Sequence, residues 1–182
     1  MTKIISIVDI KGGTGKSITS LALQKKLIQD GFTVELLNEG VLEMVSPAVE
    51  SNTDYVIIDA SPGFAFSEKL NEWVQASDML ITPVAESTFV LKALNSTINK
   101  MSELNNKSRN AIVYTGNRNS ELFQEIKGEV QQKIEGTNIM EVDIFAPVLL
   151  DESWSNQEIQ QHIASYIVKE MDQELSILLQ NL

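Results

Sequence analysis

The sequence contains no cysteine, only two arginines and one histidine. The missing cysteines exclude disulfides, thiolate metal sites and iron–sulfur clusters, and they fit a reducing cytosol. The formal net charge is −11, and acidic residues are scattered along the chain without any basic cluster. A domain whose main function is to bind nucleic acid usually has a basic surface. We therefore expect any binding to nonspecific DNA to be weak and to need a patch assembled by folding or dimerisation.

Long apolar runs and flexible linkers are also missing. No apolar run is long enough to span a bilayer, and the N-terminus enters a strand pattern at once, so we expect neither a transmembrane segment nor a signal peptide. No stretch rich in proline, glycine or serine divides the 182 residues, of which 43% are hydrophobic. This length and composition can bury one sizeable core. We predict a single domain over residues 1–182, located in the cytoplasm.

Short apolar runs rich in β-branched residues alternate with helical patterns. The predicted strands are Lys3–Val8, Thr33–Leu37, Tyr55–Asp59, Met79–Pro83, Ala111–Thr115 and Ile139–Asp143. The predicted helices are Ser17–Asp30, an apolar stripe from Val90 to Leu104, Glu121–Glu135 and Glu158–Leu179. Several strands carry consecutive apolar residues, as in sheets covered on both faces. The alternation predicts an α/β domain with a largely parallel sheet, whose ligands bind at the carboxyl ends of the strands.

The segment KGGTGKS follows the first predicted strand and opens the first predicted helix. Its three glycines let the backbone curl so that N–H groups converge on phosphate oxygens, and the positive end of the helix adds to that field. Lys16 would neutralise β- and γ-phosphate charge, and the Ser17 hydroxyl would coordinate Mg²⁺. The alternative is a glycine-rich turn with incidental lysines. The candidate phosphate-binding residues are Lys11, Gly12, Gly13, Thr14, Gly15, Lys16, Ser17 and Ile18.

A second candidate position lies in DYVIIDASPG, where a buried strand ends in the carboxylate of Asp59. The carboxyl end of a neighbouring parallel strand would place Asp59 beside the glycine-rich segment, where it could hold Mg²⁺ through water. Alternatively, Asp59 only caps the turn before Pro62. The pairing with the upstream segment favours the metal-binding interpretation.

The string KGGTGKS resembles the deviant Walker A motif, KGGxGK[ST], of the ParA/MinD family of P-loop ATPases. It departs from the ordinary P-loop pattern because Ile10 stands where that pattern has glycine. The segments DYVIIDASPG, ASDMLITPVAES and AIVYTGNRNS are similar to later strands of the same family, and in length the chain resembles the short plasmid-partition members. The resemblance implies a three-layer P-loop NTPase fold of the SIMIBI type, a mostly parallel central sheet flanked by helices, and ATP or ADP with Mg²⁺ as ligands.

The resemblance also implies roles for individual residues. In this family the early lysine, here Lys11, reaches across a dimer interface to the nucleotide of the other subunit. The catalytic residues would be Lys11, Lys16 and Asp59, and the metal would lie between Ser17 and Asp59. In this family an asparagine at the end of a strand binds adenine. The resemblance therefore implies that Asn117 binds adenine and that Arg118 flanks the base. Asn117 could equally be a turn residue.

Several positions depart from the family pattern. The carboxylates that usually follow the second strand and position the attacking water are replaced by Asn38 and Gly40. An amide can orient water but is a poor base. Asp9 could partly compensate, or it only caps the turn. Ile18 replaces the hydroxyl residue that usually touches the α-phosphate, and Thr19 approaches from a different angle. These departures predict slow hydrolysis or weakened nucleotide binding.

The last predicted helix carries an apolar stripe. The stripe consists of Ile163, Ile167, Met171, Leu175, Leu178 and Leu182. MinD-type proteins end in a membrane-binding amphipathic helix, and such helices carry Lys and Arg on their polar face. Here that face offers Glu170, Asp172 and Glu174 against the single Lys169. The pattern therefore favours packing against the sheet over membrane binding.

The sequence supports three interpretations of function. The leading one is a ParA-like ATPase that forms a homodimer around ATP and positions a plasmid or other cargo with a ParB-like adaptor protein, in the cytoplasm or associated with the nucleoid. The second is a degenerate, non-hydrolysing interaction protein with the same loop. The third is a small-molecule ATP-dependent ligase or kinase, although a chain this short has little room for a substrate pocket.

Overall fold

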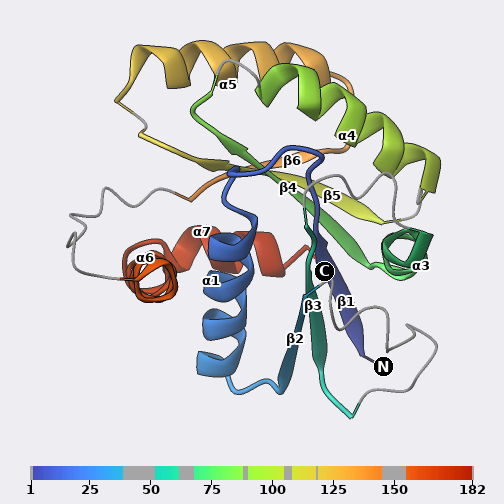
Figure 1. The fold of residues 1–182 in the computed structure, drawn as a ribbon, viewed down its shortest axis with the longest axis vertical. Coiled ribbons are helices and arrows are strands. Elements are labelled where there is room, and N and C mark those ends of the chain that lie inside the picture. The colour runs from blue at the N-terminus through green and yellow to red at the C-terminus, as the bar shows by residue number, and fades with distance from the viewer. Residues whose placement is uncertain are drawn as a thin grey trace.

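The computed structural model describes residues 2–38, 52–61, 68–87, 90–104, 108–117, 119–144 and 155–181. Within these ranges six strands form one parallel sheet in the order β2-β3-β1-β4-β5-β6 (Figure 1). The strands are β1 (Lys3–Ile7), β2 (Val34–Asn38), β3 (Tyr55–Asp59), β4 (Met79–Ala85), β5 (Arg109–Thr115) and β6 (Met140–Asp143). The helices are α1 (Lys16–Gln29), α3 (Glu68–Ala76), α4 (Val90–Leu104), α5 (Glu121–Ile134), α6 (Asn156–Glu170) and α7 (Asp172–Leu179).

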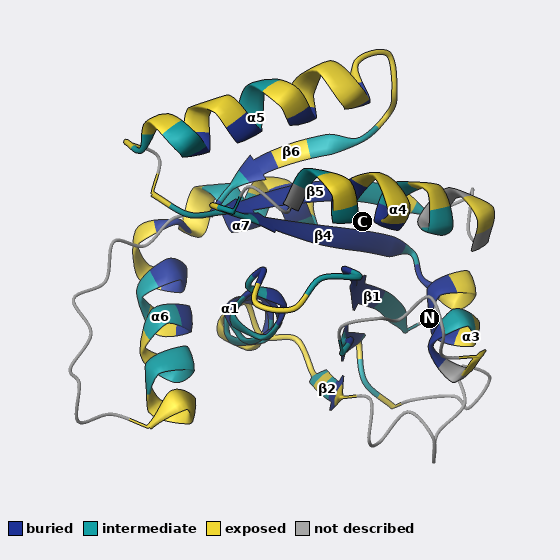
Figure 2. Ribbon diagram, turned by 45° about the horizontal axis from the view of Figure 1, so that its top comes forward, coloured by how far each residue is buried: buried dark blue, intermediate teal, exposed yellow. Residues whose placement is uncertain are grey.

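The sheet is covered by helices on both faces. Helices α1, α6 and α7 pack on one face, and α3, α4 and α5 pack on the other, while the inner strands are dark with buried residues in Figure 2. Alternate residues of one strand pack against the helices on opposite faces of the sheet. Ile57 of β3 packs in the core with α1, whereas Val56 and Ile58 pack against α3. The predicted three-layer α/β fold with its parallel sheet is confirmed.

The topology places the loop after β1 at the centre of the sheet. The chain passes from β1 to the edge strand β2, returns to β3 beside β1, and then crosses to β4 on the opposite side of β1. In open α/β sheets, the crevice where the strand order reverses is the usual ligand site. The register brings Asp59, the last residue of β3, level with Ile7 at the end of β1. The loop that follows β1 and the carboxylate at the end of β3 therefore lie together at this reversal point.

Two helical details differ from the prediction. Helix α3 was not predicted, although its buried Leu70, Trp73 and Val74 keep helical spacing. The predicted C-terminal helix is two helices, because the chain turns at Met171, which has φ −123° and ψ 29°. Asp172 then begins α7 and places its carboxylate 3.1 Å from the ammonium of Lys26 on α1. This ion pair and the burial of Met171 anchor the turn against α1.

The apolar stripe of α6 and α7 lies in the main core. Ile167, Met171, Leu175 and Leu178 are all buried together with residues of α1 and the sheet. Full burial of such side chains stabilises the fold by about 1.5–3 kcal/mol each. The prediction that this segment packs against the sheet is confirmed for the described residues of the stripe, and Leu182 lies outside the described residues. Among the described residues, the helices are too short or too polar to cross a membrane.

Candidate functional site

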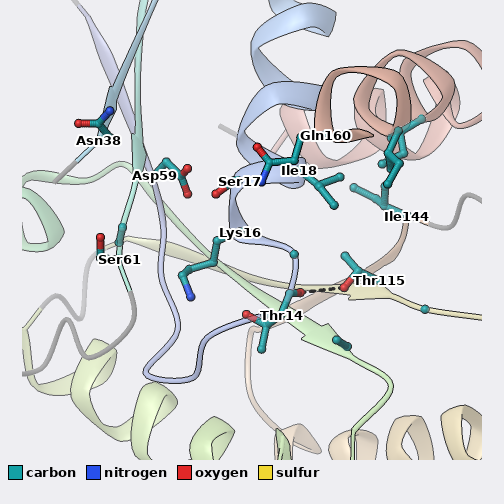
Figure 3. A pocket seen from close by; sticks show the side chains of 17 residues that line it. Thr14, Lys16, Ser17, Ile18, Asn38, Asp59, Ser61, Thr115, Ile144 and Gln160 are labelled. Carbon is teal, nitrogen blue, oxygen red and sulfur yellow. Dashed lines mark hydrogen bonds between the residues drawn. The ribbon is translucent and has the colours of Figure 1, made fainter. Parts of the chain in front are cut away.

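The loop between β1 and α1 depends on glycine at two positions. Gly13 and Gly15 have φ values of 73° and 97°, which side-chain-bearing residues rarely adopt. A Cβ atom on Gly15 would also lie 2.9 Å from the Thr115 hydroxyl oxygen at the end of β5. That hydroxyl donates a 2.8 Å hydrogen bond to the carbonyl of Thr14 (Figure 3). The end of β5 therefore holds the loop, a role of Thr115 that sequence patterns did not indicate.

The first turn of α1 presents its backbone N–H groups to the site. Gly15 precedes the helix, and no side chain caps its N-terminus. The first N–H groups of an α-helix have no partner within the helix, and they carry its positive end. A helix beginning this way at a glycine-rich turn can receive an anion such as phosphate.

Lys16 lies inside the loop. Only 6% of its surface is exposed, and its ammonium donates to the carbonyl oxygens of Lys11 at 2.7 Å and Asp9 at 3.4 Å. Burial lowers the pKa of Lys16, while the carboxylates of Asp9 and Asp59 oppose that shift. A buried cation in this position would gain from an anionic ligand in the loop, because the ligand would offset the cost of removing the ammonium from water.

Asp59 projects from the end of β3 toward Ser17 (Figure 3). Its Oδ1 is buried and has no hydrogen-bond partner within the described part of the chain. Burial raises the pKa of Asp59, and the hydroxyls of Ser17 and Ser20 and the charge of Lys16 oppose the shift. Carboxylate and hydroxyl oxygens are the donors that Mg²⁺ prefers. An unpartnered carboxylate oxygen beside a serine hydroxyl fits such an ion.

The side chains of Lys11 and Asp9 both make hydrogen bonds to other described residues. The ammonium of Lys11 donates a 2.7 Å hydrogen bond to the hydroxyl of Ser87, just after β4. Asp9 is only 3% exposed, and its Oδ1 accepts hydrogen bonds from the backbone N–H of Lys11 and the hydroxyl of Thr97 on α4. Of the two alternatives for Asp9, the turn cap is the one that the structure shows. Gly12 is exposed and, like Lys11, does not line the cavity described next.

A cavity of about 600 Å³ opens over the loop. Its floor is the segment from Gly13 to Ile18, and Asn38 and Asp59 contribute at the ends of β2 and β3. Asn38 is level with Asp59 in the paired strands and is exposed. Figure 3 shows it beyond Asp59, on the side away from Ser17. Gly40, the other position where we expected a carboxylate in related proteins, lies outside the described residues.

The far wall of the cavity comes from helix α6 and the end of β6. It includes Ile144, Gln160, Ile163 and Ile167. Nothing in the sequence indicated this contribution, because the helical pattern of α6 does not reveal which cavity it borders. Thr19, the other residue considered for the hydroxyl missing at Ile18, is fully buried and does not line the cavity.

Of the two residues nominated for the base, only Asn117 lies within the described residues. Asn117 is exposed, and its side-chain oxygen accepts a hydrogen bond from the backbone N–H of Asn119 at 3.1 Å. This is the geometry of a turn residue. Gly116 lines the cavity, whereas Asn117 does not. Arg118 lies outside the described residues. The adenine-binding roles of Asn117 and Arg118 stay predictions.

Comparison with known proteins gives structural matches only. No protein-family model and no curated protein sequence matches the chain. A protein of Borrelia burgdorferi B31 assigned to plasmid partition and bound to AMPPNP superposes with a TM-score of 0.72 at 16% identity, over 100% of both chains. The ParA of pNOB8, bound to nonspecific DNA, has a TM-score of 0.61 at 13% identity, over 96% of this chain and 100% of that one.

A biosynthetic enzyme has a similar structure. Cobyrinic acid a,c-diamide synthase from Mycobacterium smegmatis, with bound ADP and magnesium, matches with a TM-score of 0.63 at 15% identity, over 94% of this chain and 93% of that one. Identities this low establish the fold and do not choose among the activities of these proteins. The protein therefore has the three-layer fold of the ParA/MinD-type P-loop ATPases, with its glycine-rich loop at the carboxyl end of the central strand.

Proposed function

We propose that the protein is a ParA-like, Mg²⁺-dependent ATPase that switches between a monomer and an ATP-bound homodimer, hydrolyses ATP slowly, and positions a plasmid or other cargo. The observation that carries the proposal is the convergence of Lys16, Ser17 and Asp59 on one cavity above the N-terminus of α1. Fold neighbours crystallised with AMPPNP or with ADP and magnesium support the choice of ligand.

Each residue of the cavity floor has a task in this proposal. The N–H groups from Gly13 to Ser17 bind phosphate oxygens, and Lys16 exchanges its two carbonyl partners for the β- and γ-phosphates. Ser17 and Asp59 would hold Mg²⁺, which supplies positive charge to the phosphate oxygens. Water then attacks the γ-phosphate while the lysines stabilise the developing negative charge.

Lys11 is proposed to act on the nucleotide of the partner subunit. Its ammonium is held by Ser87, outside the cavity that contains Lys16. Because the Lys11 ammonium does not reach the phosphate site of its own subunit, it could contact the nucleotide bound to a second subunit. Pairing of two subunits around ATP would then bring an additional positive charge to the γ-phosphate.

Slow hydrolysis is proposed because the cavity contains an amide where a carboxylate would position water. Asn38 lies level with Asp59 at the mouth of the cavity. An amide oxygen accepts a hydrogen bond from water but withdraws its proton poorly. If turnover is absent altogether, the protein would be the non-hydrolysing interaction protein, with ATP fixing the dimer.

The proposed partners follow from charge and packing. A ParB-like adaptor would hold the cargo DNA, because a net charge of −11 leaves this chain poorly suited to bind it tightly. The dimer would bind nonspecific DNA weakly, and the structure of pNOB8 ParA is bound to nonspecific DNA. The apolar stripe of α6 and α7 is buried in the core, which supports a function without membrane binding.

An ATP-dependent ligase or kinase is the second candidate. Its support is the structural match to cobyrinic acid a,c-diamide synthase. Such an enzyme needs a second substrate before phosphoryl or acyl transfer proceeds, whereas a partition-type switch hydrolyses ATP alone or with its adaptor. ATP turnover that rises on addition of a macromolecular partner, without any small co-substrate, favours the switch.

Calorimetric titration with Mg²⁺-ATP tests the proposal directly. The native protein should bind, and Lys16→Ala should lose most of the affinity because the phosphates lose their buried cation. Lys25→Ala is the matched control, since Lys25 is on the same helix but does not line the cavity. Equal affinities of the native protein and Lys16→Ala would contradict the nucleotide site.

A further inference from the structure

The cavity has a polar end and an apolar end. Figure 3 shows Asn38, Asp59, Ser17, Ile18 and Ile144 succeeding one another across it, with Lys16 below the polar half. The polar end suits phosphates and attacking water. The apolar end, which Ile163 and Ile167 of α6 also line, suits a flat nucleobase. A nucleoside triphosphate bound in the loop would therefore extend from Lys16 toward Ile144.

Gln160 stands between these two ends. It reaches from α6 over the first turn of α1, with its carboxamide on the side of Ser17 (Figure 3). The side chain is half-buried and makes no hydrogen bond to any other described residue. Two other polar side chains line the cavity near Gln160. The hydroxyl of Thr115 already donates to the loop carbonyl of Thr14, and the hydroxyl of Thr14, although it has no partner among the described residues, is buried. Gln160 is thus a partly exposed polar side chain at this position that has no hydrogen bond to another described residue.

We propose that Gln160 binds the ribose hydroxyls of the nucleotide, which makes α6 part of the nucleoside site. The inference rests on the nucleotide-binding function proposed above. A carboxamide both donates and accepts hydrogen bonds, as a sugar hydroxyl does, so the two groups complement each other. Between the phosphate loop and an apolar base site, the sugar is the portion of the nucleotide that lies opposite Gln160. The neighbouring Ile18 provides no polar side chain for it.

The test compares ligands that contain or lack the hydroxyls. Calorimetry would measure binding of ATP, 2′,3′-dideoxy-ATP and tripolyphosphate, each with Mg²⁺, to the native protein and to Gln160→Ala. Loss of one or two neutral hydrogen bonds should weaken ATP binding by about 3- to 30-fold. The dideoxy nucleotide should already bind the native protein less tightly than ATP, and the substitution should leave its affinity and that of tripolyphosphate almost unchanged.

Two further variants control for packing. Gln160→Leu keeps the bulk and helix propensity of the side chain and should behave as Gln160→Ala does. Gln157→Ala lies on the same helix, is exposed and does not line the cavity, so it should bind all three ligands as the native protein does. Circular dichroism would confirm that the variants fold.

Three outcomes would overturn the inference. They are unchanged ATP affinity in Gln160→Ala, equal losses for ATP and the dideoxy nucleotide, and an equal loss for tripolyphosphate. The second would place Gln160 on the base, and the third would indicate a disturbance of the loop. If the native protein binds none of the ligands, the proposed function fails first.

Discussion

Substitution of Gly15 by alanine should destabilise the protein more than substitution of any other glycine in the described loop. The backbone at Gly15 has φ 97°, and holding alanine there costs about 1–3 kcal/mol. The new Cβ would also meet the hydroxyl oxygen of Thr115 at 2.9 Å, so the side chain or the loop must move. Movement weakens the hydrogen bond from Thr115 to Thr14, worth about 0.5–1.5 kcal/mol. We expect a total loss of about 1.5–4.5 kcal/mol.

Gly13→Ala separates the two contributions. Gly13 also has a positive φ, 73°, but a Cβ there would meet nothing within 4 Å. Gly13→Ala should therefore lower the free energy of unfolding only through backbone strain at positive φ, by about 1–3 kcal/mol. Thr115→Ala should cost about 0.5–1.5 kcal/mol through the lost hydrogen bond. In the double variant the contacts with the Thr115 hydroxyl and methyl groups are removed, although the Cβ of residue 115 stays at 3.3 Å, and the hydrogen bond is not lost twice. Gly15→Ala and Thr115→Ala should therefore cost less together than the sum of their separate effects.

Urea unfolding followed by far-UV circular dichroism would measure these free energies, provided that the m-values of the variants agree. ATP affinity, measured on the same samples, should fall more in Gly15→Ala than in Gly13→Ala, because only the first moves the loop away from β5. Equal stabilities of the two glycine variants, combined with strict additivity in the double variant, would refute the idea that Thr115 holds the loop.

Three further predictions concern the proposed switch. Lys11→Ala should retain most of the monomer's nucleotide affinity but lose ATP-dependent dimerisation, measured by light scattering with a non-hydrolysable ATP analogue; dimers as abundant as those of the native protein would exclude a role across the interface. Basal ATP turnover should be slow, and Asn38→Asp should raise it severalfold by supplying a carboxylate beside Asp59; fast turnover of the native protein would contradict this reasoning. Binding to random duplex DNA without a partner should be weak and fall steeply with salt, because the net charge is −11; tight binding at physiological salt would reveal a basic patch that composition conceals.

Local patterns in the sequence determined the strands, most of the helices and the parallel direction of the strands. All six predicted strands are present within two residues of their expected ends. The inner strands carry compact apolar runs whose burial is favourable on both faces of the sheet, whereas the edge strands β2 and β6 place an exposed glutamate, Glu35 or Glu141, between apolar residues. The loop could be located because the need for glycine at positive φ, shown at Gly13 and Gly15, leaves a direct mark in the sequence. Asp59 could be placed beside the loop because parallel strands bring their carboxyl ends to one edge.

Only the tertiary structure decided which distant residues meet at that edge. Thr115 contacts the loop across 101 positions of sequence, and Gln160 reaches the cavity from a helix whose periodicity indicates its buried face but not its neighbours. The same applies to Asp9, whose cap on the turn depends on Thr97 of α4. Such contacts are set by the order of strands and the packing of helices on them. Spacing along the chain carries no signal for them, because their partners are selected by the fold as a whole.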